Sequence, residues 1–377
     1  MKIPITKTYT NELESKAVCE VLDSGWLVQG KKISEFERNF CELTSSKFAV
    51  ATSNCTTSLH LSLLSLNLKE GDKIIVPSFT HTATANVVEY INATPVFVDV
   101  ELETFNIDVK HVSEILIKDR ESDNPSIKGI IPVHLFGLCA NMTAIMDLAK
   151  KYNLFVIEDA ACALGSYHFN KHAGTFGDTG CFSFHPRKSI TTGEGGMIIT
   201  DNPSVERWTR SARAFGGPHF DKLGYNYRIT DIQGAIGVEQ LKKFSFINSQ
   251  RVRRAKIYNE RLSGIEWLKT PQEPKNYKHA YQSYVILVNA KEINAHEIKK
   301  ATQFRDAAME RLSERGIYTR HGTHAVHALE YYKRKYNLKD GDFLNSLAAD
   351  RMSITLPLYP QMSDKEQEYV INAIKEI

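Results

Sequence analysis

Short apolar segments alternate with helical patterns through the first half of the chain, and this alternation constrains the fold more than any other feature. Apolar runs at 73–77, 95–100 and 129–134 predict strands, and the segments 81–91 and 142–152 predict helices. Such alternation indicates a mainly parallel sheet with helices on both faces. In a sheet of this kind the functional residues gather at the carboxyl ends of the strands. We therefore expect a three-layer α/β domain with its site at that edge.

The last third of the chain predicts a second, smaller α/β unit. A long polar helix over about 244–262 leads into an apolar strand at 281–288 and a helix at 301–314. The length of 377 residues also exceeds that of an average domain. We predict a large domain over residues 1–250 and a small carboxy-terminal domain over residues 251–377.

Composition and charge exclude several classes of protein. A formal net charge of +3 is too small to indicate a nucleic-acid partner, and we interpret the basic run 251–256 as a solvated helix face. The six cysteines show no metal-ligand spacing and are typical of reduced thiols. No stretch approaches the ~18 apolar residues of a membrane span, and no apolar leader segment follows Met1. We expect a cytoplasmic protein that binds neither nucleic acid, membrane nor metal.

Lys188 is the first candidate functional residue. It follows Ser183 and the predicted strand 180–184, and it precedes a glycine-rich turn and a second strand at 197–200. A lysine amine that burial keeps neutral can act as a nucleophile, and in enzymes that use pyridoxal 5′-phosphate (PLP) it carries the cofactor as an imine. This position therefore predicts a covalent role for Lys188.

Asp159 is a candidate partner for that lysine. It closes the apolar run 154–159, which is typical of a buried parallel strand that ends on a polar residue. A PLP ring acts as an electron sink when a carboxylate keeps its pyridine nitrogen protonated. The alternative is that Glu158 or Asp159 only caps the next helix.

A cofactor phosphate needs a helix N-terminus, because the unpaired N–H groups and the helix dipole there favour an anion. The segment 48–58 supplies a short strand, a polar turn and the start of a helix that carries Leu59 and Leu63 on its apolar face. Ser183 offers a second hydroxyl. We expect the phosphate site between this turn and Ser183.

Seven segments together resemble the DegT/DnrJ/EryC1/StrS family, the PLP-dependent sugar aminotransferases of fold type I. They follow one another in the family's order over roughly the first 240 residues, so the set is far more specific than any single motif. The segments are 24–26, 53–56, 77–86, 157–161, 174–178, 183–196 and 226–233.

The resemblance implies a role in cofactor binding for several of these residues. Lys188 forms the imine with PLP and moves a proton once the substrate amine has released it. Asp159 holds the pyridinium. Thr56, Ser183 and the backbone amides around Cys55 bind the phosphate.

Four further positions take their roles from the same resemblance. His81 stacks on the cofactor ring, and Cys162 stands near the 3′ oxygen where the family usually has glutamine or histidine. Asn226 reaches the phosphate of the neighbouring subunit, and Arg228 lies close to the substrate. The resemblance therefore implies a homodimer with shared active sites.

The resemblance also implies the substrates, with L-glutamate as amino donor and a nucleotide-linked keto-sugar as acceptor, for surface polysaccharide or another amino sugar. His327 matches the substrate side of the family pattern, and the histidines and arginine of 320–327 favour a smaller phosphorylated or acidic ketone, such as dihydroxyacetone phosphate or a keto-octulosonate. Alternatively, two of these histidines only fill the domain interface. Glu194 is either a solvated turn acid or a residue that faces the substrate.

Two other functions are possible for a chain with this fold. A PLP dehydratase of the same family has histidine in place of the lysine, so the presence of Lys188 argues against it. A non-catalytic PLP-fold ligand sensor is usually joined to a DNA-binding module, and we expect no helix-turn-helix module beside this sequence. We interpret His60, His134 and His185 as packing residues.

Overall fold

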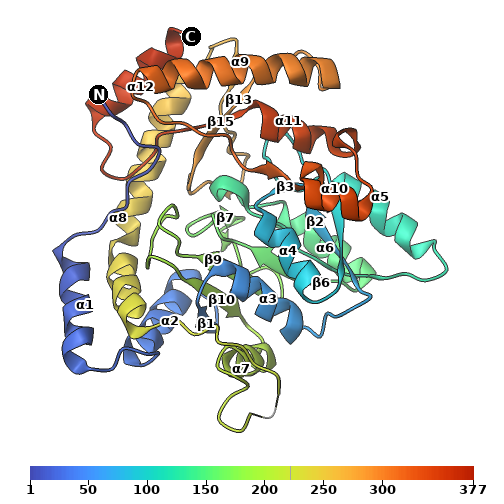
Figure 1. Ribbon diagram of the computed structural model, residues 1–377, viewed down its shortest axis with the longest axis vertical. Helices are drawn as coiled ribbons and strands as arrows, with labels where there is room; N and C mark the ends of the chain where they lie inside the picture. Colours follow the sequence, from blue (N-terminus) through green and yellow to red (C-terminus); the bar gives the residue numbers. More distant parts are fainter. Residues whose placement is uncertain (221) are drawn as a thin grey trace.

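A seven-stranded sheet forms the centre of the protein, whose computed structural model describes residues 1–220 and 222–377 (Figure 1). Its strands have the order β1-β10-β9-β6-β5-β2-β4. Strand β10 runs antiparallel to both neighbours, and the pairings among β9, β6, β5, β2 and β4 are parallel. The bounds are β1 Phe48–Thr52, β2 Lys73–Pro77, β4 Thr94–Val98, β5 Ile127–Ile130, β6 Phe155–Asp159, β9 Thr179–Ser183 and β10 Gly196–Thr200.

Helices cover both faces of this sheet. Successive strand residues point to opposite sides, so the strands present apolar side chains to the helices on each face. On β1, Ala49 and Ala51 pack with α2, α5, α6 and α8, whereas Val50 packs with α3, α4 and α7. The bounds are α1 Glu12–Ser24, α2 Lys31–Thr44, α3 Cys55–Ser65, α4 Thr82–Tyr90, α5 Val109–Arg120, α6 Met142–Tyr152, α7 Pro203–Ala212 and α8 Asp231–Leu262. The predicted three-layer, mainly parallel α/β fold is confirmed.

A second hydrophobic core lies around a three-stranded antiparallel sheet of order β11-β13-β15. Ile3 belongs to this core, and its backbone forms a parallel bridge with Ile317. The bounds are β11 Leu268–Lys269, β13 Tyr284–Val288, α9 Ala295–Glu314, α10 Glu330–Tyr336, α11 Leu344–Met352, β15 Ser353–Leu356 and α12 Asp364–Lys375. The division at residue 250 falls inside the continuous helix α8 and stays a prediction.

Two small sheets connect the larger parts. One has the order β12-β7-β8, and the other pairs β14 with β3 next to the carboxyl end of β2. The bounds are β3 Phe79–Thr80, β7 Tyr167–His168, β8 Lys171–His172, β12 Tyr277–Lys278 and β14 His324–Ala325, and short 3₁₀ turns span Leu135–Gly137, Val326–Ala328 and Asp340–Phe343. The β14–β3 pair brings the carboxy-terminal third of the chain to the site edge of the large sheet.

The long helix differs from the expectation in two ways. Helix α8 starts at Asp231 because Thr230 and Gln233 form a reciprocal N-terminal cap. The run 251–256 is not a solvated face, since Arg251 and Arg254 are buried. Arg251 donates to two backbone carbonyls, and Arg254 pairs with Asp364. Within the described residues, no helix combines the length and apolar character that crossing a membrane requires.

Candidate functional site

The ends of three strands deliver the predicted residues to one edge of the sheet. Strand β1 leads into the N-terminus of α3, β6 ends on Asp159 and β9 ends on Ser183. After β9 the chain makes a tight turn, in which Lys188 donates its backbone N–H to the His185 carbonyl at 2.8 Å. Gly193 closes the turn at a φ of 84°, a conformation that side chains disfavour.

Lys188 points its amine at Cys162. The Nζ–Sγ distance is 3.1 Å, a hydrogen bond between the two side chains. Burial favours the neutral amine, but Cys162 and Asp159 outweigh it and raise the pKa of Lys188 above its ordinary value. The sulfur and carboxylate groups near the amine therefore favour its charged form here, and the covalent role of Lys188 stays a prediction.

Asp159 is 5% exposed and has two donors from the protein. The Thr84 hydroxyl donates to its Oδ2 at 2.8 Å, and the Ala161 N–H donates to its Oδ1 at 3.1 Å. Thr84 in turn lies 3.0 Å from the hydroxyl of Thr80. The contact of Thr84 with Asp159 was not predicted, although Thr84 lies inside the motif at 77–86. The helix-cap alternative for Asp159 is not what the structure shows, since turns rather than a helix follow β6.

The N-terminus of α3 leaves room for an anion. The Asn54 side chain accepts from the Thr57 N–H at 2.9 Å, and no acceptor among the described residues bonds the N–H groups of Cys55 and Thr56. The Thr56 side chain is partly exposed. A Cβ atom on Gly196 would lie 2.4 Å from the Asn54 carbonyl oxygen, so glycine lets β10 start directly against this turn.

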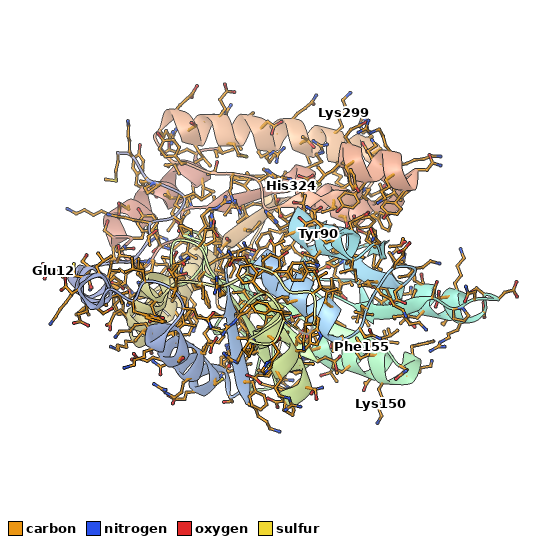
Figure 2. The ribbon with its side chains drawn as sticks, turned by 60° about the horizontal axis from the view of Figure 1, so that its bottom comes forward. Glu12, Tyr90, Lys150, Phe155, Lys299 and His324 are labelled. Atoms are coloured by element: carbon orange, nitrogen blue, oxygen red, sulfur yellow. The ribbon has the colours of Figure 1, made fainter. Side chains whose placement is uncertain are left out.

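His81 caps α4 from the loop before that helix. Its Nδ1 accepts from the Ala83 N–H at 3.2 Å, and partial burial together with the nearby Lys188 lowers the pKa of its imidazole. In the β14–β3 pair His324 stands opposite Thr80, one residue before His81. Figure 2 shows His324 inside the outline of the molecule, whereas charged side chains elsewhere project from its rim. The carboxy-terminal third of the chain thus contributes to the surroundings of His81.

Three predicted residues lie exposed on the segments that flank the site. Glu194 is exposed in the turn after Lys188, and its carbonyl accepts from Gln233 Nε2 at 2.8 Å. Asn226 and Arg228 are exposed on either side of Tyr227, whose carbonyl accepts the Ser53 N–H at 2.9 Å. The guanidinium of Arg228 lies 5.0 Å from the ring centre of Phe215. The roles of Asn226 and Arg228 stay predictions.

His327 does not fit its predicted place on the substrate side. Its ring is fully buried, Nδ1 lies 2.5 Å from the Ser78 hydroxyl and Nε2 lies 3.2 Å from the Asp340 carbonyl. Both ring nitrogens are therefore already bonded, and Phe343 packs edge-on against the ring. The geometry makes His327 a packing residue, which corrects our interpretation of this histidine.

Glu158 and His134 form a separate buried pair behind the site. Glu158 Oε2 lies 2.8 Å from His134 Nε2, and both side chains are fully buried. The Glu158 carboxylate also accepts the backbone N–H groups of Gly174, Phe176 and Gly177 at 2.6–2.7 Å. The Ala140 N–H donates to His134 Nδ1 at 3.1 Å, so Nδ1 carries no proton and the neutral ring donates from Nε2 to Glu158. The motif at 174–178 thus serves to hold Glu158.

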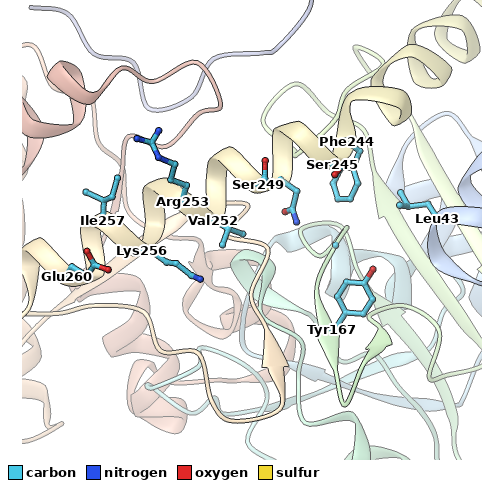
Figure 3. Close-up of a pocket in the computed structure, with 12 residues that line it drawn as sticks. Leu43, Tyr167, Phe244, Ser245, Ser249, Val252, Arg253, Lys256, Ile257 and Glu260 are labelled. Carbon is cyan, nitrogen blue, oxygen red and sulfur yellow. The ribbon is translucent and has the colours of Figure 1, made fainter.

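An open groove along α8 is not the site. It has a volume of about 770 Å³, and Figure 3 shows Ser249, Arg253 and Lys256 of α8 opposite Tyr167. None of the predicted site residues lines this groove. The chemistry-bearing side chains gather instead around Lys188.

Comparisons with known proteins agree with this arrangement. The uncharacterized protein MJ1066 of Methanocaldococcus jannaschii is 38% identical over 390 residues, which cover 100% of this chain and 97% of that protein. The crystal structure of a DegT DnrJ EryC1 StrS aminotransferase from Brucella abortus is 29% identical, with a TM-score of 0.87 and coverage of 97% and 95%. PseC of Helicobacter pylori, an aminotransferase involved in the biosynthesis of pseudoaminic acid, is 25% identical, with a TM-score of 0.90 and coverage of 100% of this chain and 99% of that chain.

The family comparison covers almost the whole sequence. The model of the DegT/DnrJ/EryC1/StrS aminotransferase family matches residues 8–375. The resemblance drawn from seven motifs is therefore confirmed, as is the expectation that the protein is an aminotransferase. This chain belongs to the DegT/DnrJ/EryC1/StrS aminotransferase family.

Proposed function

We propose that this protein is a PLP-dependent transaminase that moves the amino group of L-glutamate onto the keto group of a nucleotide-linked sugar, for surface polysaccharide or another amino sugar. The observation that carries the proposal is the Lys188 amine beside Cys162 and within the field of the buried Asp159 carboxylate. Lysine and carboxylate are the two groups that PLP chemistry requires of a protein.

The residues present fit PLP. Asp159 still has acceptor capacity after its bonds to Thr84 and Ala161, and can hold the proton of the pyridine nitrogen. The unbonded N–H groups at the start of α3, with the hydroxyls of Thr56 and Ser183, suit the phosphate. We assign ring stacking to His81 and the 3′ oxygen to Cys162.

The protein's own part in the reaction is to hold groups and move protons. When bound, PLP supplies an electron sink for the electrons left on the substrate carbon. Lys188 Nζ takes the proton from that carbon and returns one in the second half of the exchange. The Thr84 hydroxyl fixes the orientation of Asp159, which holds its proton on the ring nitrogen throughout. Glu194 and Arg228 are our candidates for substrate contacts.

A sugar acceptor is supported by the relatives. PseC is involved in the biosynthesis of pseudoaminic acid, and its structure overlays the whole of this chain. A smaller phosphorylated or acidic ketone is the second candidate, because Arg320, His321 and His324 add positive or protonatable groups near His81. We further propose a cytoplasmic homodimer in which Asn226 completes the phosphate site of the neighbouring subunit.

The test follows the visible absorbance of the PLP-loaded protein. L-Glutamate is expected to bleach it, and one ketone from a panel of 4-keto nucleotide sugars, dihydroxyacetone phosphate and acidic keto-sugars should restore it. Lys188→Ala serves as the control and should show neither change. A protein that binds PLP but does not respond to L-glutamate would contradict the proposed donor, and one that responds to no amine would be a sensor rather than a transaminase.

A further inference from the structure

Thr191 holds together the segment 184–195 between β9 and β10, which carries Lys188 and which we call the lysine turn. Its hydroxyl donates to the Phe184 carbonyl at 2.8 Å and accepts from the Gly193 N–H at 3.0 Å. Thr191 is buried, and a buried backbone N–H costs free energy unless an acceptor is present. The acceptor of the Thr191 N–H therefore helps to set the position of the whole turn.

Helix α8 supplies that acceptor. Gln240 Oε1 accepts from the Thr191 N–H at 3.3 Å. Earlier on the same helix, Gln233 Nε2 donates to the Glu194 carbonyl at 2.8 Å. Residues seven positions apart lie on one face of a helix. One face of α8 therefore holds the lysine turn at two points, and Gln240 is the buried one of the pair, at 1% exposure.

Two groups that can only accept fix the orientation of the Gln240 amide. Its Nε2 donates to the Tyr9 carbonyl at 2.7 Å and to Glu14 Oε1 at 2.6 Å. Burial disfavours the carboxylate form of Glu14, but Lys243 and other hydrogen-bond donors outweigh it and lower its pKa. Both hydrogens of the amide nitrogen are therefore used on the side of Tyr9 and Glu14. The oxygen is left to face the Thr191 N–H.

Packing alone does not require an amide at this position. Helix α1 lies beside α8 (Figure 1), and an apolar contact between them is made by Ala17, Val21 and Ala235. An apolar side chain in place of Gln240 would fill the same space, but it would leave the Thr191 N–H and two acceptors unpaired. The amide therefore adds direction to the packing, because it joins the N-terminal segment and α8 to the lysine turn.

We propose that Gln240 is a positioning residue for the reaction, which holds the lysine turn through Thr191 and so keeps the Lys188 amine in place. This inference rests on the proposed transaminase function. It goes beyond that function, because Gln240 lies outside all seven motif segments. A reacting group that is displaced by a fraction of its own size loses much of its rate, so a residue behind the turn affects the reaction without contact to the substrate.

The test replaces Gln240 with methionine, which keeps the length of the side chain and removes the amide. Hydrogen–deuterium exchange of the PLP-loaded protein, followed by mass spectrometry, measures how often the lysine turn opens. We expect peptides from this turn to exchange about tenfold faster or more, because the Thr191 N–H loses its acceptor. The Kd for PLP, measured by absorbance titration, should rise by about tenfold, since binding must then also order the turn.

Gln367→Met is the matched control. Gln367 on α12 is also 1% exposed, and its amide bonds the carbonyl of Arg254 at 2.7 Å and the guanidinium of the same residue at 3.1 Å. Its replacement should lower the temperature of thermal unfolding about as much as Gln240→Met does. The exchange of the lysine turn and the Kd for PLP should stay at the wild-type values.

A double variant tests whether the acceptor itself is what matters. Glu14→Gln/Gln240→Glu exchanges the two side chains, so one carboxylate and one amide remain and an oxygen still faces the Thr191 N–H. Exchange of the turn and the Kd for PLP should return close to the wild-type values. Gln240→Asn, which shortens the side chain and keeps a polar group in the core, takes the place of Gln240→Met if the methionine variant does not fold, with the same expected changes.

The outcomes separate the two proposals. If Gln240→Met leaves the exchange of the turn and the Kd for PLP unchanged, or if Gln367→Met alters them equally, the positioning role is wrong. It is also wrong if the turn exchanges faster while the Kd for PLP and the rate of bleaching by L-glutamate stay at the wild-type values. If the turn and the Kd for PLP depend on Gln240 while no amine bleaches the wild type, Gln240 positions Lys188 and the proposed transaminase is wrong.

Discussion

Glu158 and Asp159 are neighbours on β6, yet they have different partners because successive strand residues face opposite sides. Glu158 is fully occupied by His134 and by three backbone N–H groups of the loop 174–177. Asp159 receives one hydroxyl, from Thr84, and one backbone N–H. A carboxylate can accept about four hydrogen bonds. Glu158, the saturated acid, therefore stabilises the fold. Asp159, the unsaturated acid, can still accept a hydrogen bond from a ligand.

The largest expected effect comes from replacing the unsaturated acid. Asp159→Asn should slow bleaching by L-glutamate by about 10²- to 10⁴-fold, because an amide cannot hold the pyridinium proton as a carboxylate does. Stopped-flow absorbance of the PLP-loaded variant measures this rate. Thermal unfolding should change little. If the variant reacts at the wild-type rate, Asp159 is not the cofactor's partner.

The complementary change replaces Glu158, the saturated acid. Glu158→Gln places an NH₂ donor among the backbone N–H donors of the loop 174–177 and removes the partner of His134. We expect a loss of about 3–5 kcal/mol in the free energy of unfolding, measured in urea. The rate per folded molecule should stay close to that of the wild type. An equal loss of activity in both variants would remove the distinction between the two acids.

The smallest expected effect concerns the donor to Asp159. Thr84→Val removes the 2.8 Å hydrogen bond but keeps the shape of the side chain, and should slow bleaching by about tenfold. Thr84→Ser keeps the hydroxyl and is the matched control. If valine and serine at this position behave alike, the hydroxyl does not orient Asp159.

Much of this arrangement could be predicted from the sequence. Local patterns were sufficient to predict the parallel sheet. They also placed Asp159 and Ser183 at strand ends and Lys188 in the turn that follows, because each of these features is built from neighbouring residues. The pairs Thr84–Asp159 and Gln282–Arg187 join residues 75 and 95 positions apart, and only the folded chain brings them together.

The errors have a common physical cause. His327 and the run 251–256 were interpreted from residue type, since polar residues are mostly exposed or functional. In the structure a hydroxyl and a carbonyl satisfy the His327 ring, and the carbonyls of Gln282 and Leu358 satisfy Arg251. A polar residue can be buried when the fold supplies partners, and the sequence pattern does not reveal them.

The bridge between Ile3 and Ile317 has a consequence for how the protein is made. Ile3 is fully buried in the carboxy-terminal core, and the Leu358 N–H donates to the carbonyl of Ile5 at 3.1 Å. During synthesis on the ribosome the segment around Ile3 emerges long before residues 317 and 358. Until those residues have been made, its apolar side chains cannot be packed in the carboxy-terminal core. The carboxy-terminal core therefore closes as a late event, and a fragment that starts at residue 251 lacks part of its own interior.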